Sequence, residues 1–562
     1  MTGEWFENEE WFIKSNRSLA TAFDETVARY PGREALVYKS QRQTYKELQE
    51  RANRFAKGLI SLGVKKGDHV AIWSTNSMEW VCAQFAAFKV GAPLIPMNTR
   101  FKPSEVEYIL RQSDCQTLIF KEEFLGIINA SDILNGLIPE LKDSEPGNLF
   151  SSKFPRLKNV IHMGDRGQPG MCGFDEILKM GDNPVLDGEL KKAQDSIAPE
   201  DIGYIMYTSG TTGFPKGAML RQRNSLALFY ILSGKNVKGM SAETRQLCVA
   251  PLFTNFGSSG SVLEGFLRGA CVTLLETFDP EEALKAITNE KITHMWAVPT
   301  MVIMMLEHPQ FKDYDVTSLR VLGLGGAPVS SKLCSDLEKN TRVEMIINAY
   351  GLVEASGVCT VTPPGAAAEI VGGTIGKPLP YAKVKIVDPE TLKDMSEGEE
   401  GEIWVVDNTT PGRHVMAGYY NMSEATSEAI VNGWLRTGDM GKLRKDGFFE
   451  ITGRLKDMIL VGAFNVYPVE IEDSIRRYPG VSDVSVIGIP DHRLGEVPVA
   501  YVRLKKGVTC SEEEIIRFCR DRMANTKVPR HVMFIDELPM TPVGKVQKFK
   551  LRESAAKDLK LE

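Results

Sequence analysis

Alternation between strand-like and helix-like segments is the feature that most limits the folds open to this chain. Residues 69–74 (HVAIWS) form a short apolar run that is typical of a buried strand. Residues 78–89 carry apolar side chains at helical spacing, and residues 91–96 (GAPLIP) form a second short apolar run. A strand, a helix and a strand at this spacing indicate a βαβ unit, in which the two strands are parallel. The sequence therefore predicts an α/β fold that is built on a parallel sheet.

The same alternation returns later in the chain. Strands are predicted at residues 273–275 and 294–298, helices at residues 45–62, 280–290 and 302–307, and a loop at residues 142–155. From about residue 383 the pattern changes to short alternating segments, such as KVKIVD and GEIWVV, with glycine-rich turns between them. Such segments are typical of antiparallel strands or of a small barrel.

The length of the chain, 562 residues, is too great for one compact core, so two or more domains are expected. We expect an N-terminal domain over residues 1–455, made of stacked mixed or parallel sheets with helices and a small barrel-like subdomain. A small α+β domain is expected over residues 456–562, because a segment of about a hundred residues, a normal domain size, follows the GRLKD motif at residues 453–457.

Composition and charge count against several classes of protein. A formal net charge of −6 and a pI of about 5.9 argue against a general nucleic-acid surface. The nine cysteines form no CxxC or CxxH pair, which argues against a zinc site and a disulfide framework. The acidic start MTGEWFENEEWF lacks the order of a signal peptide, and no run of about 18 apolar residues occurs. We therefore expect free thiols in a cytoplasmic protein with no transmembrane segment and no nucleic-acid partner.

A glycine-rich segment at residues 207–217 (YTSGTTGFPKG) predicts phosphate binding. Glycine lets the backbone approach a ligand closely, and consecutive backbone N–H groups form an anion nest. The hydroxyls and Lys216 add donors and charge. The segment is not a Walker loop, because Gly217 stands where the Ser or Thr of a GK[ST] triplet would be. A flexible surface loop is the competing interpretation, but it leaves the closing Pro-Lys-Gly unexplained.

Five further motifs follow in a fixed order. They are GGAP at residues 325–328, NAYGLVE at 348–354, GWLRTGD at 433–439, GRLKD at 453–457 and LPMTPVGK at 538–545. Together with the glycine-rich segment they resemble the adenylate-forming superfamily, which contains acyl-CoA synthetases, firefly luciferase and the adenylation domains of peptide synthetases. The resemblance covers about residues 19–550. It implies a small mobile C-terminal domain and a carboxylate that is activated by ATP and Mg²⁺ as an acyl adenylate.

The resemblance also implies site residues. During adenylation negative charge builds on phosphate oxygens, so fixed donors and cations should converge there. The implied catalytic residues are Thr208, Lys216, Glu354 and Lys545. The implied nucleotide-binding residues are Thr208, Ser209, Gly210, Thr211, Thr212, Gly213, Lys216, Gly325, Gly326, Ala327, Pro328, Asn348, Ala349, Tyr350, Gly351, Asp439, Arg454 and Lys545. Glu354 would hold Mg²⁺ with Thr211 or Thr212 nearby, and Lys456 would be the hinge of the C-terminal domain.

Each implied residue has an ordinary structural explanation when it is taken alone. Glu354 could be an acid at a helix N-terminus, Asp439 a turn residue, and Lys545 a solvated lysine. Only their joint occurrence in the family's order favours the catalytic interpretation.

Three positions depart from the family's common pattern. Val353 stands where Thr is usual, so one hydrogen bond to the α-phosphate should be missing. Thr254 and Gln222 stand where His is frequent. None of these changes removes an essential charge, so activity is still expected.

In the family, a second step transfers the acyl group from the adenylate to an acceptor, and this sequence favours CoA as that acceptor. Gly257 replaces the Asp that binds the substrate amine in peptide synthetases, so an amino-acid substrate is disfavoured. Residues 461–466, with Gly462, would line the pantetheine tunnel, and Lys527 and Arg530 are candidates for the CoA phosphates. The predicted acyl segments, residues 251–260, 294–300 and 321–327, contain Phe253, Thr254, Phe256, Gly257 and Trp296. They hold no Lys or Arg, so a short-to-medium or a cyclic or aromatic monocarboxylate is expected rather than a dicarboxylate.

Other classes stay open. A ligase that loads a carrier protein would keep the same adenylation chemistry, and a catalytically weak binding paralogue is conceivable because of Val353. A luciferase-like oxygenase would share the fold. The sequence leaves a homo-oligomer open.

Overall fold

A computed structural model describes residues 17–124, 126, 128–164, 167–208, 215–234, 237–407, 415–461, 464–491, 494–523, 525–540 and 546–559. The chain divides into two compact units, residues 1–383 with 405–435, and residues 384–404 with 436–562. The domain boundary predicted at residues 455 and 456 lies inside the second unit and stays a prediction.

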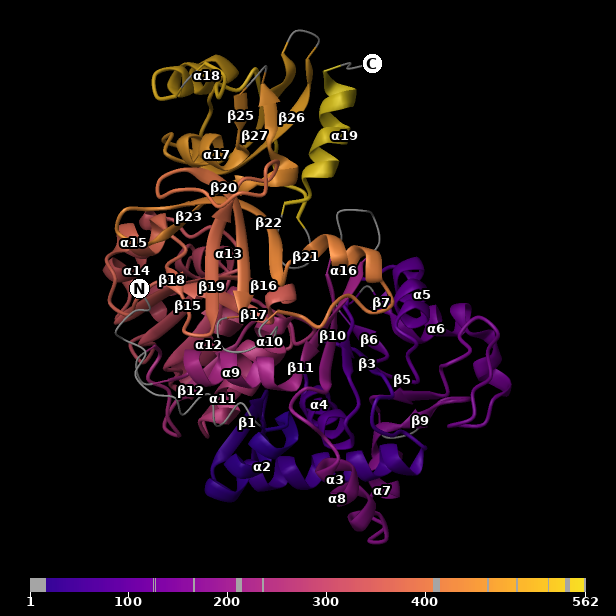
Figure 1. Ribbon diagram of the computed structural model, residues 1–562. Helices are drawn as coiled ribbons and strands as arrows, with labels where there is room; N and C mark the ends of the chain where they lie inside the picture. Colours follow the sequence, from indigo (N-terminus) through magenta and orange to yellow (C-terminus); the bar gives the residue numbers. More distant parts are fainter. Residues whose placement is uncertain are drawn as a thin grey trace. The chain divides into compact units, whose positions relative to one another are not determined.

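The first unit contains two large sheets (Figure 1). Among the described residues, nine strands form the sheet that we call the large sheet. In spatial order they are β18 (Lys377–Pro378), β17 (Gly357–Val361), β16 (Met345–Leu352), β15 (Val321–Gly325), β14 (His294–Ala297), β12 (Arg245–Cys248), β13 (Cys271–Leu274), β1 (Glu34–Tyr38) and β2 (Gln41–Thr44). The strands from β16 to β1 are parallel, and the outer strands pair antiparallel.

The second sheet of this unit has seven strands among the described residues. They are β11 (Lys216–Arg221), β10 (Ile202–Thr208), β4 (Leu94–Pro96), β3 (Val70–Trp73), β5 (Thr117–Phe120), β8 (Asn159–His162) and β9 (Cys172–Gly173). Only β10 and β11 pair antiparallel within it. The predicted βαβ unit is therefore confirmed as β3, α4 and β4, with the two strands directly paired.

Helices cover the sheets because their apolar residues face them. The helices of the first unit are α2 (Leu19–Arg29), α3 (Tyr45–Ser61), α4 (Met78–Val90), α5 (Pro103–Gln112), α6 (Ala130–Leu137), α7 (Phe174–Met180), α8 (Leu186–Asp195), α9 (Gln222–Leu232), α10 (Asn255–Gly257), α11 (Glu264–Leu267), α12 (Pro280–Glu290), α13 (Pro299–Leu306), α14 (Ser331–Asn340), α15 (Ala368–Gly373) and α16 (Ser423–Ala429). Residues of α12, α13 and α14 share one core cluster with residues of β12, β14, β15 and β16, so these helices cover one face of the large sheet.

Local sequence signals explain where the central helices begin and end. Thr44 and Glu47 form a capping box at the start of α3, as the predicted helix requires. The Ser77 hydroxyl accepts from the Trp80 N–H at the start of α4, and Gly91 ends that helix in the left-handed conformation with φ 73°. The buried residues of α4 lie on all its sides, which is the pattern of a helix enclosed by protein.

A further sheet contains β19 (Ala382–Val387), β20 (Glu400–Asp407), β22 (Trp434–Leu443) and β21 (Ile430–Val431), and β23 (Phe449–Arg454) pairs with β22. Strand β22 pairs antiparallel with both β21 and β23. This half-barrel confirms the small barrel-like subdomain that the alternating segments predicted. The boundaries between the two units fall within β19, β20 and β22.

The rest of the second unit is a mixed sheet with helices on both faces (Figure 1). Its strands are β25 (Phe464–Val466), β24 (Ile459–Val461), β27 (Gly495–Leu504), β26 (Val481–Asp491) and β28 (His531–Phe534). Helices α17 (Pro468–Arg476) and α18 (Glu512–Arg520) share a core with one face, and α19 (Lys548–Asp558) shares a core with the other. The predicted α+β character is confirmed.

Candidate active site

A carboxylate, a threonine and a tyrosine meet in the first unit. Glu354 lies in the short turn Val353–Ala355 after β16, and Thr208 ends β10. The Thr208 hydroxyl donates to Glu354 Oε1 at 2.8 Å, and the Tyr419 hydroxyl donates to the same oxygen at 2.9 Å. The Met416 N–H donates to the backbone carbonyl of Glu354 at 2.7 Å. The structure thus joins two implied catalytic residues directly.

Tyr419 is a residue that the motif analysis missed. It reaches the cluster because residues 417–420 run beside β11, with Ala218 and Tyr419 forming an antiparallel bridge. The Tyr420 N–H donates to the Gly217 carbonyl at 2.8 Å, and the Met219 N–H donates to the Gly418 carbonyl at 2.9 Å. The only signal in the sequence was the turn-forming stretch GYYN, which follows no predicted motif.

The surroundings of Tyr419 favour its neutral form. Burial raises the pKa of Tyr419 well above its ordinary value, and the negative charge of Glu354 raises it further. Tyr419 therefore stays a hydrogen-bond donor. The Lys216 ammonium lies 5.4 Å from the centroid of the Tyr419 ring, a cation–π contact that brings a positive charge to the same place.

The glycine-rich segment is held at both ends. Thr208 pairs with Lys216 and Tyr207 pairs with Gly217 across β10 and β11. An added Cβ at Gly217 would stand 2.9 Å from an Ile205 methyl and 3.0 Å from the Tyr207 ring, so this position requires glycine. The predicted residues Ser209, Gly210, Thr211, Thr212 and Gly213 lie outside the described residues.

Several of the residues predicted to bind the nucleotide lie where β15 and β16 end. Gly325 pairs with Ala349, and an added Cβ at Gly325 would stand 2.8 Å from the Ala349 carbonyl oxygen. Gly326 has φ 76°, which favours glycine. Both strands end at the edge of a parallel sheet where ligands bind in open α/β folds. Ala327 and Pro328 follow directly.

Asn348, Tyr350 and Gly351 belong to β16. The Asn348 amide donates to the carbonyls of Val371 and Thr374 at 3.0 and 2.8 Å, so it holds the strand to α15. Tyr350 is buried. Contact of these three residues with a nucleotide stays a prediction.

The second unit carries Asp439 and Arg454 on paired strands. They face each other across β22 and β23, and Arg454 Nε lies 2.9 Å from Asp439 Oδ1. Buried Glu402, which the sequence analysis missed, supports this pair. It accepts hydrogen bonds from the Trp404 indole N–H, from Arg436 and from the Gly438 N–H, at 2.9, 3.0 and 3.0 Å. These contacts fix the turn that presents Asp439.

The positions that depart from the family pattern have local explanations. The Thr254 hydroxyl caps α10 by accepting from the Gly257 N–H at 3.1 Å, and it donates to the Pro251 carbonyl at 2.7 Å. Gln222 Oε1 accepts from the Leu19 N–H at 2.9 Å. An added Cβ at Gly257 would stand 2.3 Å from the Pro251 carbonyl oxygen. The local backbone therefore requires glycine at residue 257, whatever room the acyl group needs.

The predicted acyl segments come together, but a lysine from outside them joins the group. Phe256 and Trp296 pack edge to face with ring centroids 5.7 Å apart, and Phe253 is half-buried. Lys238 lies 4.0 Å from the centroid of the Trp296 ring and pairs with Glu264. The three segments themselves hold no Lys or Arg, and the monocarboxylate expected from them stays a prediction.

Among the predicted CoA residues, Lys527 forms an ion pair with Glu470, and Arg530 is exposed. Lys456 lies in the turn Leu455–Asp457, while Gly462 and Lys545 lie outside the described residues. The flanks of Lys545 are held by a bridge between Met540 and Val546.

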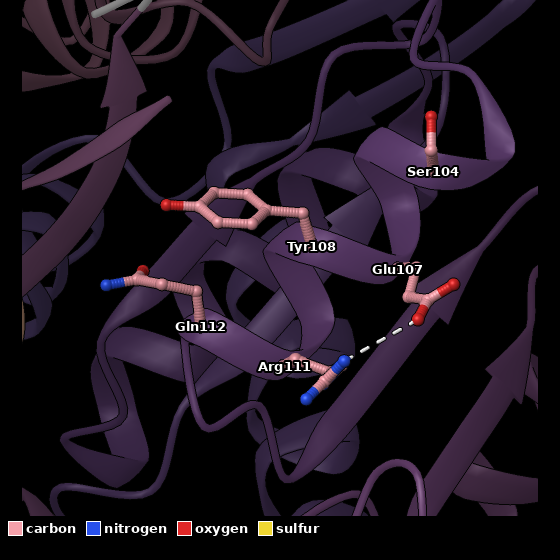
Figure 2. A pocket seen from close by; sticks show the side chains of 5 residues that line it. All are labelled: Ser104, Glu107, Tyr108, Arg111 and Gln112. Carbon is pink, nitrogen blue, oxygen red and sulfur yellow. Dashed lines mark ion pairs between the residues drawn. The ribbon is translucent and has the colours of Figure 1, made fainter. Parts of the chain in front are cut away.

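A surface cavity of about 590 Å³ lies along α5 (Figure 2). Ser104, Glu107, Tyr108, Arg111 and Gln112 line it. The Tyr108 hydroxyl donates to the Pro215 carbonyl at 3.1 Å, and the Gln112 amide donates to the Tyr420 carbonyl at 2.7 Å. The cavity therefore adjoins the segments that carry Lys216 and Tyr419, although no predicted site residue lines it.

The fold and the two motif clusters define an adenylate-forming enzyme, and comparison with known proteins agrees. In the fold comparison, the anthranilate CoA ligase AuaEII in complex with anthranoyl-AMP has a TM-score of 0.84 and 28% identity, with 97% of this chain and 98% of that chain covered. The AMP-binding enzyme family matches residues 23–420, and the AMP-binding enzyme C-terminal domain matches residues 470–545. The chain belongs to the AMP-binding enzyme family.

Relatives over almost the whole chain are acyl-CoA synthetases and ligases. YngI of Bacillus subtilis (strain 168), which is provisionally named as an acyl-CoA synthetase, is 40% identical over 95% of this chain and 96% of the relative. The mitochondrial medium-chain acyl-CoA ligase ACSF2 of Mus musculus is 35% identical over 97% of this chain and 89% of the relative. No helix within the described residues is long and apolar enough to cross a membrane.

Proposed function

We propose that the chain is an acid–thiol ligase that converts a monocarboxylic acid to its acyl-CoA through an acyl adenylate, with ATP and Mg²⁺, and releases AMP and pyrophosphate. The observation that carries this proposal is the meeting of Thr208, Tyr419 and Glu354 at the base of the glycine-rich segment. A carboxylate with hydroxyl groups around it offers the hard oxygen ligands that Mg²⁺ prefers. When bound, Mg²⁺ would neutralise charge on the phosphate oxygens.

In the proposed first step, an oxygen of the acid attacks the α-phosphorus and the bond to pyrophosphate breaks. Lys216 and Lys545 would supply positive charge to the phosphates and to the attacking carboxylate. Thr208 and Tyr419 hold Glu354 in a fixed position, so no reorganisation of this carboxylate is needed when charge develops. In the second unit, Asp439 suits the ribose hydroxyls, because a carboxylate can accept two hydrogen bonds.

In the proposed second step, the CoA thiol gives its proton to solvent and its sulfur attacks the acyl carbon, a thioester bond forms, and AMP leaves with the electron pair of the broken bond. We propose that residues 456–562 turn about Lys456 between the two steps, so that Lys545 withdraws and residues 461–466 approach the adenylate. Lys527 and Arg530 remain the candidates for the CoA phosphates, and Lys527 would first have to leave Glu470.

For the acid, we propose a short-to-medium or a cyclic or aromatic monocarboxylate. The names of the relatives support this class, since one is a medium-chain ligase and another a ligase of a bicyclic propanoate from Mycobacterium tuberculosis. For the compartment, we propose a reducing one such as the cytoplasm. All nine cysteines lie in the described part of the chain and are free thiols.

The test is a panel of carboxylic acids with ATP, Mg²⁺ and CoA, read by AMP and by thioester formation. We expect both products in equal amounts from at least one acid. AMP and pyrophosphate without thioester would instead favour another acceptor, and an amide bond synthetase is among the similar solved structures. A phosphopantetheinylated carrier protein and a simple amine would then be offered in place of CoA. No AMP with any acid would contradict the proposal.

A further inference from the structure

Trp296 shares a face of the large sheet with the GGAP segment at residues 325–328, which is predicted to bind the nucleotide. Strands β14 and β15 pair with Trp296 beside Gly323. Residues two apart on a strand point to the same side, so Gly323 and Gly325 open onto one face. The Trp296 indole lies against Gly323, where an added Cβ would stand 2.1 Å from a ring carbon. The ring therefore covers the surface that continues inward from Gly325.

A buried ion pair holds this ring from its other sides. The side chains of Lys238 and Glu264 are 2% and 0% exposed and pair with each other. The Trp296 indole N–H donates to Glu264 Oε2 at 2.7 Å, and the Lys238 ammonium lies 4.0 Å from the centroid of the ring. Trp296 itself is 1% exposed. The indole is thus fixed by a hydrogen bond, a cation–π contact and a backbone surface.

Burial makes this arrangement costly, as the pKa values of the pair show. Burial lowers the pKa of Lys238 to about 8, against the opposing effect of Glu264, and burial raises the pKa of Glu264. Replacing a buried ion pair with apolar side chains of similar volume is often neutral or stabilising. Stability alone therefore gives little reason to keep Lys238 and Glu264 at this place.

The chain brings Glu264 to the ring through an unusual helix. Residues Ser258–Leu263 form a π-helical turn, and Glu264 follows it as the first residue of α11. Such turns are rare and are frequent at functional sites. The same turn follows α10, whose Phe256 packs edge to face on Trp296. Each of the three predicted acyl segments thus contributes one residue to this contact, namely Phe256, Trp296 and Gly323.

We propose that Trp296 is the distal wall of the acyl site and limits the length of the acid, and that Lys238 and Glu264 are positioning residues that keep its indole rigid. This inference rests on the proposed function. The acyl chain must extend away from the nucleotide along the face that Gly325 and Gly323 share, and the indole blocks that path. Rotation of the indole would break both its hydrogen bond to Glu264 and its cation–π contact with Lys238. The ring therefore does not move aside for a longer acyl chain.

The experiment compares wild-type protein with Trp296→Leu and Trp296→Phe on straight-chain acids from butanoate to hexadecanoate, by pyrophosphate release. In the wild type, kcat/KM should fall sharply beyond one chain length. In Trp296→Leu, the ratio of kcat/KM for a longer acid to that for the best wild-type acid should rise about 10-fold or more, since one misfitted methylene is worth about 10–200-fold. The milder Trp296→Phe should shift the profile in the same direction.

The positioning role has its own variant. Lys238→Met with Glu264→Gln removes both charges together, so no uncompensated charge stays buried, and it leaves an amide oxygen that can accept from the indole N–H. The length profile of this double variant should broaden although Trp296 is intact. Lys238→Arg alone keeps the cation, so its length profile should stay close to that of the wild type.

A matched control is Trp73→Phe in the second sheet. Trp73 is also fully buried, and its indole N–H donates to the Asn98 carbonyl at 3.1 Å. This variant should lower the melting temperature and leave the length profile unchanged. If the Trp296 variants and the double variant behave like Trp73→Phe, the wall proposal is overturned. If the wild type forms no adenylate from any acid in the series or in the wider panel, the proposed function fails and this inference fails with it.

Discussion

At the scale of single residues, the proposed function assigns Glu354 the role of holding Mg²⁺ at the phosphates. Glu354→Gln keeps the size of the side chain and removes its charge. We expect pyrophosphate release to fall about 100-fold or more at saturating Mg²⁺, because the charged oxygen ligand that would hold Mg²⁺ against the phosphates is lost. The melting temperature should change little, since Gln can still accept from Thr208 and Tyr419. Activity within about twofold of the wild type would contradict the role of Glu354.

Tyr419→Phe is the matched control for Glu354→Gln. It keeps the ring beside Lys216 and removes only the hydroxyl that donates to Glu354. A hydrogen bond to a charged group is worth about 1.5–3 kcal/mol, so a loss of about 10- to 100-fold is expected. An effect of Tyr419→Phe as large as that of Glu354→Gln would show that the tyrosine itself contacts the reacting groups.

Val353 gives a prediction in the opposite direction. It begins the turn that holds Glu354, and its carbonyl accepts from the Ser356 N–H at 2.8 Å. Val353→Thr leaves that backbone bond in place and adds a hydroxyl where the family commonly has one. If one hydrogen bond with a net worth of about 0.5–1.5 kcal/mol forms, kcat/KM for ATP should rise a few-fold. A decrease would mean that the valine serves packing instead.

His294 predicts a loss of stability in mild acid. Burial lowers its pKa to about 4 from an ordinary value of 6.5, and its Nε2 lies 3.0 Å from the Lys238 carbonyl oxygen. The unfolded chain takes up the proton below pH 6.5, while the folded chain takes it up only near pH 4. Stability is therefore lost as pH falls through this window, by about 3 kcal/mol in total. Urea unfolding should show that the free energy of unfolding falls less between these pH values in His294→Gln than in the wild type.

At the scale of elements, the sequence predicted what depends on local pattern. The helices at α3, α4 and α12 and the strands β3 and β14 lie within a few residues of their predicted bounds, because caps, prolines and apolar periodicity are local signals. The contacts of Tyr419, Glu402 and Lys238 could not be predicted in this way. Each of these residues reaches its site through pairing or packing with a distant segment, and no local pattern records such a contact.

Helix α19 gives the prediction at this scale. Lys548 in its first turn pairs with Glu472 of α17 at 2.8 Å, and Glu472, which is 7% exposed, also accepts from the Val486 N–H at 2.8 Å. Lys548→Met leaves this buried carboxylate with only Arg476, whose guanidinium lies 3.9 Å from it, so the second unit should lose up to about 3 kcal/mol of stability. Lys550→Met, at an exposed position of the same helix, is the control and should change stability by less than about 0.5 kcal/mol.

Adding Glu472→Gln to Lys548→Met should restore most of the lost stability, because the buried charge, which then has only the more distant Arg476 as partner, is removed as well. Chemical unfolding followed by a signal from the second unit measures all three variants. Equal stability of Lys548→Met and Lys550→Met would show that the ion pair contributes little.

At the scale of the whole molecule, the proposed reaction needs two arrangements of one chain. The groups that expel pyrophosphate and the tunnel that admits a thiol cannot occupy the same space beside the adenylate, so the proposed movement of residues 456–562 would serve the two steps in turn. The turn Leu455–Asp457 begins that segment. Arg552 of α19 lies 3.6 Å from Asp457, so the helix that follows Lys545 in the chain contacts the proposed hinge.

Two variants should therefore fail at different steps. Lys545→Ala should lose acyl-adenylate formation and still convert a supplied acyl adenylate with CoA, because only the first step uses its charge. Lys456→Pro fixes φ near −65°, so it should keep adenylation and slow thioester formation. Each half-reaction is measured separately, by pyrophosphate release and by thioester formation from synthetic adenylate. Equal damage to both steps in Lys545→Ala, or an intact second step in Lys456→Pro, would contradict alternation in this protein, because a single fixed arrangement would then serve both steps.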